Sequence, residues 1–129
     1  MGWMVLSVGL GGALGAISRY LISLLVTGSF GQSGWMAMLS VNAAGSLIMG
    51  MMAALLTVSS LFGDPVCGFV TIGFLGALTT FFSFAFDAYN FFQRGEVLAG
   101  GLYLLSSVCL SVAGFYVGLV VVRLIAGQG

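Results

Sequence analysis

Four long apolar stretches take up almost the whole sequence. They cover residues 3–26, 35–61, 66–92 and 98–124, and the second contains no charged side chain. A helix needs roughly 20 apolar residues to cross the hydrocarbon core of a bilayer, so each stretch is long enough to span it once. The segments between them are short and contain turn-forming residues, such as the Gly-Asp-Pro sequence that ends at Pro65. The pattern predicts an all-α membrane protein in which four transmembrane helices form one domain, residues 1–129.

Charged side chains are too few to give a soluble protein its surface. Only 5% of the residues are charged, whereas a soluble domain carries about 25%. The charged residues are Arg19, Asp64, Asp87, Arg94, Glu96 and Arg123. The net charge is zero, which gives no basis for a nucleic-acid partner. The first apolar stretch follows no basic residue and is too long for a cleaved signal peptide, so we expect it to be retained as a helix.

The arginines divide almost evenly between the two sides of the membrane. If the N-terminus, residues 62–65 and the C-terminus share one side, that side holds Arg123. The other side holds Arg94 and, if its side chain reaches the interface, Arg19. Because Lys and Arg collect on the cytoplasmic side, two alternatives stay open. Either the chain inserts in both directions and forms an antiparallel homodimer, or the small bias orients it uniquely.

Glycine is abundant, at 21 residues, and recurs at helical spacing. Three pairs of small residues four apart illustrate the pattern. These pairs are Gly11 with Gly15, Ser46 with Gly50, and Gly114 with Gly118. Such pairs let helix backbones approach closely in lipid, so we expect tight helix packing, which by itself indicates no function.

The sequence lacks the groups that catalysis requires. It has no histidine, and Arg19 and Asp87 are the ionisable residues set within the apolar stretches. General acid–base and nucleophilic catalysis need titratable groups within reach of each other. We therefore do not expect an enzyme. Arg19 has three possible roles, which are to extend to the interface, to pair with Asp87, or to form an electropositive vestibule for anions.

The third stretch combines glycine, hydroxyls and aromatic rings near its middle. Gly76, Thr79 and Thr80 could break the helix there, and a broken backbone at membrane depth persists only where it is buried or lines a cavity. Carbonyls freed by such a break could bind a cation. Phe81 and Phe84 share a helix face, with Phe74 one heptad earlier. Their ring edges could meet an anion, although aromatic stripes also serve ordinary packing.

Polar groups in the second and fourth stretches could serve the same ion. Asn42 offers two amide donors, which suit either a helix–helix bond or a desolvated anion. Tyr103, Ser107 and Ser111 step by four along one face of the fourth stretch. A row of hydroxyls can solvate a passing ion, although serines also bond to the preceding helical turn.

The chain resembles the Fluc/CrcB family of fluoride channels over essentially its whole length. The resemblance rests on residues 11–20 (GGALGAISRY), on residues 42–45 (NAAG) with Gly50, and on residues 73–81 (GFLGALTTF). It implies an antiparallel dual-topology homodimer with two pores, whose third helix is broken mid-membrane. It also implies a passive, fluoride-selective channel in the cell inner membrane, which exports fluoride from the cytoplasm and lowers its toxicity.

The resemblance also implies roles for individual residues. Gly76 and Thr79 would hold a structural Na⁺ at the dimer interface through their backbone carbonyls. Arg19 matches a family arginine of the first helix, and Asp87 a position that is usually acidic. The expected fluoride-pore residues are Asn42, Phe81, Ser83, Phe84, Tyr103, Ser107 and Ser111.

The chain departs from the family pattern around the paired threonines. Phe82 and Ala85 each replace a hydroxyl, Ser83 replaces threonine, and Ala77 replaces the second glycine of a pair. These departures change the polar groups that could hydrate a pore. Two other functions remain as alternatives: a small dual-topology four-helix multidrug/proton antiporter, which needs a titratable carboxylate in its substrate cavity, and a non-transporting helical subunit of a membrane complex.

Overall fold

The computed structural model describes residues 1–30, 34–58 and 63–127, and all regular structure within these ranges is helical. The first two apolar stretches form α1 (Gly2–Phe30) and α2 (Gly34–Val58), and the fourth forms α6 (Val97–Ile125). The third contains four consecutive elements. They are α3 (Asp64–Cys67), the π-helix η1 (Gly68–Leu75), α4 (Gly76–Leu78) and α5 (Phe81–Gln93).

Helix α1, the third segment and α6 extend beyond the apolar stretches that predict them. Helix α1 continues to Phe30, so residues 27–30 are helical rather than part of a turn. This extension is reasonable because hydropathy marks where a helix meets lipid, whereas the helix ends where its backbone hydrogen bonds end. Residues 59–61 of the second predicted stretch lie outside the described residues.

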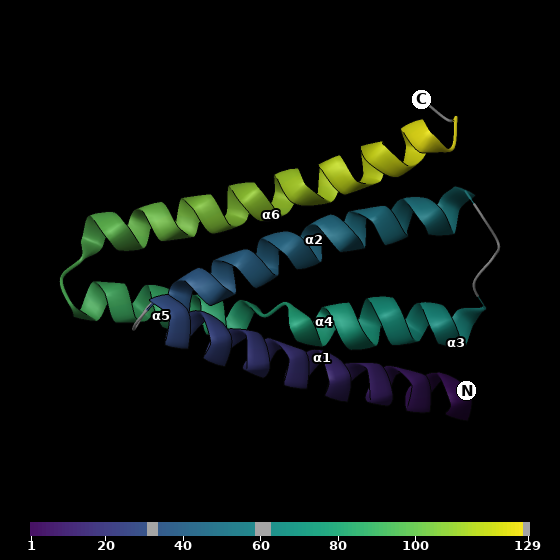
Figure 1. Ribbon diagram of the computed structural model, residues 1–129, viewed down its shortest axis with the longest axis horizontal. Helices are drawn as coiled ribbons and strands as arrows, with labels where there is room; N and C mark the ends of the chain where they lie inside the picture. The colour runs from purple at the N-terminus through teal and green to yellow at the C-terminus, as the bar shows by residue number, and fades with distance from the viewer. Residues whose placement is uncertain (31–33, 59–62, 128–129) are drawn as a thin grey trace.

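Four segments are long and apolar enough to cross a membrane within the described part of the chain. They are Gly2–Ser29, Gly34–Thr57, Asp64–Gln93 and Val97–Ile125. Successive segments run in opposite directions, so the N-terminus, α3 and the end of α6 lie at one end of the molecule (Figure 1). The turn between α5 and α6 lies at the other end. The all-helical, four-span membrane architecture predicted from the sequence is confirmed.

Glycines of α1 bring its backbone against the third segment. A Cβ atom on Gly11 would collide with the carbonyl oxygen of Phe69, and one on Gly15 with that of Phe74. Only glycine permits this backbone-to-backbone approach. Helix α1 is thereby fixed along η1 and α4.

Helices α2 and α6 pack in the same way. A Cβ atom on Gly50 would collide with the carbonyl oxygen of Phe115, and one on Gly118 with that of Leu47. The expectation of tight glycine packing is confirmed. The structure adds which helices are joined: α1 with the third segment, and α2 with α6 (Figure 1).

Two extended threonines separate α4 from α5. Thr79 has φ −80° and ψ 146°, and Thr80 has φ −150° and ψ 125°. Thr80 is the N-cap of α5, where its side chain accepts a hydrogen bond from the Ser83 amide, a role for which threonine is well suited. Gly76 itself is helical, with φ −63° and ψ −35°. The extended residues are therefore the threonines, three and four positions beyond that glycine.

The extended residues also change which side chains share a face. The sequence interpretation aligned Phe74 with Phe81 and Phe84. In the structure Phe74 packs instead against the cluster of Val41, Leu75 and Leu78. The alignment is wrong because two extended residues interrupt the helical period on which it was based.

Candidate functional site

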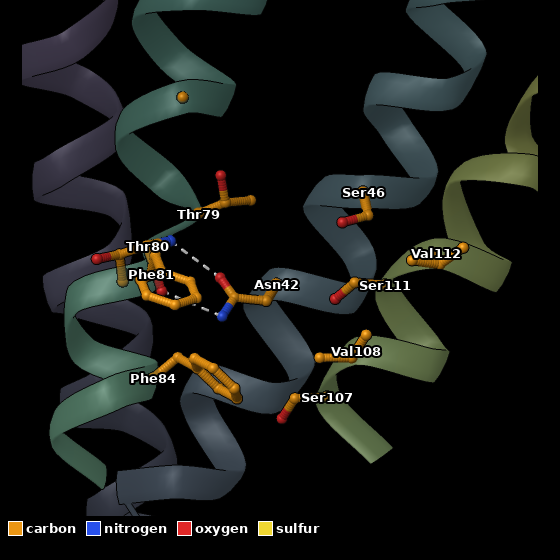
Figure 2. Close-up of a pocket in the computed structure, with 11 residues that line it drawn as sticks. Asn42, Ser46, Thr79, Thr80, Phe81, Phe84, Ser107, Val108, Ser111 and Val112 are labelled. Carbon is orange, nitrogen blue, oxygen red and sulfur yellow. Dashed lines mark hydrogen bonds between the residues drawn. The ribbon is translucent and has the colours of Figure 1, made fainter. Parts of the chain in front are cut away.

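A cavity of ≈450 Å³ lies where α2 and α6 face the extended threonines (Figure 2). Seven of its lining residues were expected at a functional site from the sequence. These are Asn42, Gly76, Thr79, Phe81, Phe84, Ser107 and Ser111. The lining is completed by Ser46, Thr80, Val108 and Val112. No charged side chain is among these residues, and we call this space the neutral cavity.

Asn42 binds the backbone of Thr80 with both ends of its amide. Its Oδ1 accepts a hydrogen bond from the Thr80 amide at 3.0 Å, and its Nδ2 donates to the Thr80 carbonyl at 3.4 Å (Figure 2). A helical Thr80 would have given its amide to the carbonyl of Gly76. Asn42 therefore stabilises the extended backbone and keeps one amide hydrogen for another partner. Of the two uses that the sequence left open for this amide, a helix–helix bond and an anion, the structure shows the first.

Phe81 and Phe84 form a ring pair at one side of the neutral cavity. Their centroids are 5.4 Å apart and the rings are tilted by 50°. Phe84 is buried and contacts the ring of Tyr103 at 5.5 Å, whereas Phe81 is 79% exposed. The Phe84 ring is therefore held in place by packing, whereas the Phe81 ring is left exposed by the rest of the chain.

Two of the three α6 residues whose hydroxyls were predicted to form a row line the neutral cavity. Ser107 and Ser111 line the cavity. Tyr103 is buried one turn earlier and donates to Oδ2 of Asp87 at 3.4 Å. The Tyr103 and Ser107 hydroxyls lie near each other, close to hydrogen-bonding range. By distance and angle, however, Ser107 Oγ has no hydrogen-bond partner among the described residues.

Ser107 brings a buried hydroxyl, with no hydrogen-bond partner among the described residues, to the wall of the neutral cavity. Ser107 is 5% exposed, and a buried polar group without a partner costs about 1–3 kcal/mol. A water molecule or an ion that accepts a hydrogen bond would recover this cost. The neutral cavity therefore suits a small hydrogen-bond acceptor.

A second cavity, of ≈330 Å³, lies beside α1 and α5. It is lined by Arg19, Ser83 and Asp87, among other residues, and we call it the charged cavity. Ser83 lies here, away from the neutral cavity, which corrects its expected place beside Phe81 and Phe84. Residues two apart on a helix face nearly opposite directions, so Ser83 points away from Phe81.

Arg19 bonds to the third segment instead of pairing with Asp87. Its Nε donates to the carbonyl of Ala77 at 3.2 Å and its Nη1 to Ser83 Oγ at 3.4 Å. The ion pair found in the described part of the chain joins Arg94 to Glu96 at 3.1 Å.

Sequence reasoning missed Thr80 and the carbonyl of Ala77 as anchoring points. The signal for Thr80 was present, because a threonine directly before an apolar helical run is an N-cap pattern. Nothing comparable marks Ala77, which takes part through its backbone alone. Ser46 was read only as a packing residue, yet it lines the neutral cavity.

These features define a small multi-pass helical membrane protein with a polar, aromatic cavity beside an interrupted helix. Interrupted helices that line cavities are found where membrane proteins bind and move ions. Residues 6–119 match the family described as "CrcB-like protein, Camphor Resistance (CrcB)". The chain therefore belongs to the CrcB family.

Individual relatives match over almost the full length of both chains. The fluoride-specific ion channel FluC of Francisella philomiragia is 42% identical over 124 residues, covering 90% of this chain and 95% of the relative. The protein of the same description from Magnetococcus marinus is 42% identical over 118 residues, covering 92% and 96%. Fluoride-specific ion channel FluC 1 of Nitrobacter hamburgensis is 35% identical over 126 residues, covering 97% and 100%.

Proposed function

We propose that the protein is a passive, fluoride-selective channel of the bacterial inner membrane. It exports fluoride from the cytoplasm and so lowers fluoride toxicity. The relatives described as fluoride-specific channels support this function over nearly the whole chain. The structural observation that carries it is the neutral cavity, in which a buried, unpaired Ser107 hydroxyl lies near aromatic rings and an amide.

The neutral cavity suits fluoride chemically. Fluoride is small and strongly hydrated, so a pore must replace the hydrogen bonds of water without binding the ion too tightly to release it. Ser107, Ser111 and the second amide hydrogen of Asn42 are donors of this kind. The ring edges of Phe81 and Phe84 add weak positive potential.

Passive conduction is sufficient for export. Hydrogen fluoride is neutral and crosses lipid, and it dissociates in a less acidic cytoplasm, where the anion is trapped. A membrane potential of 100 mV contributes about 2.3 kcal/mol per charge, which drives the anion outward through an open path. A channel therefore needs neither a coupling ion nor nucleotide hydrolysis.

The direct test is fluoride efflux from liposomes that contain only this protein. A fluoride electrode should record rapid release once a potassium ionophore removes the charge imbalance, and chloride efflux from matched liposomes should stay at background. The antiporter alternative predicts cation transport driven by a pH gradient instead. The subunit alternative predicts no transport. Either result would overturn the channel proposal.

We further propose an antiparallel, dual-topology homodimer. The arginines support it, because Arg123 is in the last turn of α6 and Arg94 is the C-cap of α5. The end of α6 lies at the same end of the molecule as the N-terminus, and the end of α5 lies at the opposite end (Figure 1). The exposed rings support it too, since Phe81 and Phe82 are 79% and 78% exposed in the single chain. A C-terminal tag should be accessible from both sides of the membrane in one population. A tag found on a single side would overturn this arrangement.

We also propose that the carbonyls of Gly76 and Thr79 hold a structural Na⁺ at the dimer interface. In an unbroken helix these carbonyls would accept from Thr80 and Ser83. In the structure the Thr80 amide bonds to Asn42 and the Ser83 amide bonds to Thr80 Oγ1. Both carbonyls are thereby released at the cavity wall, and unwound backbone carbonyls of this kind coordinate Na⁺ in other membrane proteins.

The sodium proposal can be tested without measuring transport. Replacing Na⁺ by N-methylglucamine should lower the temperature at which the purified dimer dissociates, and K⁺ should not restore it. Equal stability in all three salts would overturn the proposal.

A further inference from the structure

We infer that Arg19 is a positioning residue that holds the interrupted helix together from the charged cavity. Its guanidinium joins the last turn before the extended threonines to the first turn after them. It does so by donating to the Ala77 carbonyl at 3.2 Å and to Ser83 Oγ at 3.4 Å. The inference rests on the proposed channel function only for its transport readout.

The Ala77 carbonyl needs such a partner. In a continuous helix it would accept a hydrogen bond from the amide of Phe81, and the extended threonines separate the two. A carbonyl left unsatisfied at membrane depth is strongly destabilising. A charged donor satisfies it better than a neutral one. Because the contact uses the backbone, the alanine that replaces a family glycine at this position does not disturb it.

The position of Arg19 is fixed by the helix that carries it. Gly15 lies one turn earlier on the same face of α1 and touches the backbone of Phe74. Close packing there sets the distance from α1 to the end of α4, so the arginine side chain extends over a defined gap. Asp87 lines the same cavity.

Arg19 and Asn42 therefore act on opposite sides of one interruption. Asn42 binds Thr80 from the neutral cavity, and Arg19 binds Ala77 and Ser83 from the charged cavity. The hydrogen-bond donors of the guanidinium are then more important than its charge for holding the interruption together. In an anion-attracting vestibule, the charge would be more important than the donors.

Three substitutions separate donors from charge. In Arg19→Gln the amide nitrogen takes the place in the side chain that Nε occupies in arginine, so a neutral donor to Ala77 is kept. Arg19→Lys keeps the charge but moves the donor one bond further out. Arg19→Met has a side chain similar in length to that of glutamine, but it has neither a donor nor a charge. Arg123→Gln is the matched control, because it also removes one arginine but lies in the last turn of α6, away from both cavities.

The experiment measures hydrogen exchange of residues 76–86 in the full-length reconstituted protein, together with fluoride efflux at low and high salt. Arg19→Met should speed exchange by about tenfold and lower efflux by a similar factor. Arg19→Gln should stay within about threefold of the parent in both. Arg19→Lys should fall between them, and Arg123→Gln should match the parent. The ratio of each variant to the parent should not change with salt, because a hydrogen bond is screened far less than a long-range field.

The inference is overturned if Arg19→Lys matches the parent while Arg19→Gln behaves like Arg19→Met, with differences that fade at high salt. It is also overturned if all variants exchange like the parent. If exchange follows the expected order but the parent itself releases no fluoride, the positioning role stands and the channel proposal fails.

Discussion

The two cavities on either side of the extended threonines differ mainly in charge. The neutral cavity, of ≈450 Å³, is lined by an amide, hydroxyls and rings. The charged cavity, of ≈330 Å³, contains Arg19 and Asp87. One interruption in the backbone therefore faces two chemically distinct spaces. The difference shows how a membrane protein can use a cation to stabilise broken backbone and still offer an anion a path without a fixed charge.

The absence of a positive charge from the lining of the neutral cavity has a physical reason. A guanidinium at the narrowest point of a pore would bind an anion too tightly to release it. On the other side of the helix, the guanidinium of Arg19 stabilises the break through Ala77 and Ser83. On the proposed path the anion meets only weak donors, such as Ser107 and Ser111.

The largest effect is expected from placing a negative charge in the neutral cavity. Asn42→Asp keeps an acceptor for the Thr80 amide but loses the donor to the Thr80 carbonyl. A carboxylate at membrane depth costs about 2.5–3.5 kcal/mol, and it repels fluoride. We expect fluoride efflux to fall by roughly a hundredfold or more while the variant elutes like the parent in size-exclusion chromatography.

The control for Asn42→Asp is Gln93→Glu, which makes the same amide-to-carboxylate change at an exposed position near the end of α5. Efflux from the control should match the parent. If Asn42→Asp also conducts like the parent, the ion does not pass through the neutral cavity.

A moderate effect is expected from removing one aromatic edge. Phe81→Ile keeps an apolar side chain but loses a ring edge, and aromatic edge contacts are worth about 0.5–1.5 kcal/mol. Fluoride efflux should fall by about three- to tenfold.

Phe82 provides the matched control. Its ring is 78% exposed against 79% for Phe81, but it lines the charged cavity. Efflux from Phe82→Ile should stay close to the parent. Equal losses in both variants would contradict the division between the two cavities.

The smallest effect is expected at the unpaired hydroxyl. Ser107→Ala removes one donor from the neutral cavity, so efflux should fall by about threefold. The same change removes a buried polar group that lacks a partner. The variant should therefore unfold at a temperature equal to or above that of the parent in fluoride-free buffer.

Ser106→Ala is the comparison for Ser107→Ala, because Ser106 Oγ donates to the Tyr103 carbonyl of its own helix at 3.2 Å. Its efflux should equal that of the parent. A larger loss at Ser106 than at Ser107 would mean that the α6 hydroxyls act through helix structure rather than by contacting the ion.

The sequence by itself determined the membrane architecture and most of the neutral cavity. Hydropathy gave the four spans because each apolar stretch meets lipid directly. The spacing of Phe81 and Phe84, and of Ser107 and Ser111, placed each pair on one helix face because these residues lie within single unbroken helices. Such properties depend only on neighbours along the chain.

The tertiary structure decided how the interruption is held. Asn42 and Thr80 are 38 residues apart, and Arg19 and Ala77 are 58 apart. Hydropathy and spacing carry no information on these pairs, because backbone groups freed from a helix take whichever donors and acceptors neighbouring helices bring near. By contrast, Ser83 lies in the charged cavity because it is two residues from Phe81 on one helix, and Phe74 leaves the ring face because the extended threonines interrupt the helical period. Local pattern predicts which residues are polar or aromatic, whereas the crossing of α1 and α2 over the third segment selects their partners.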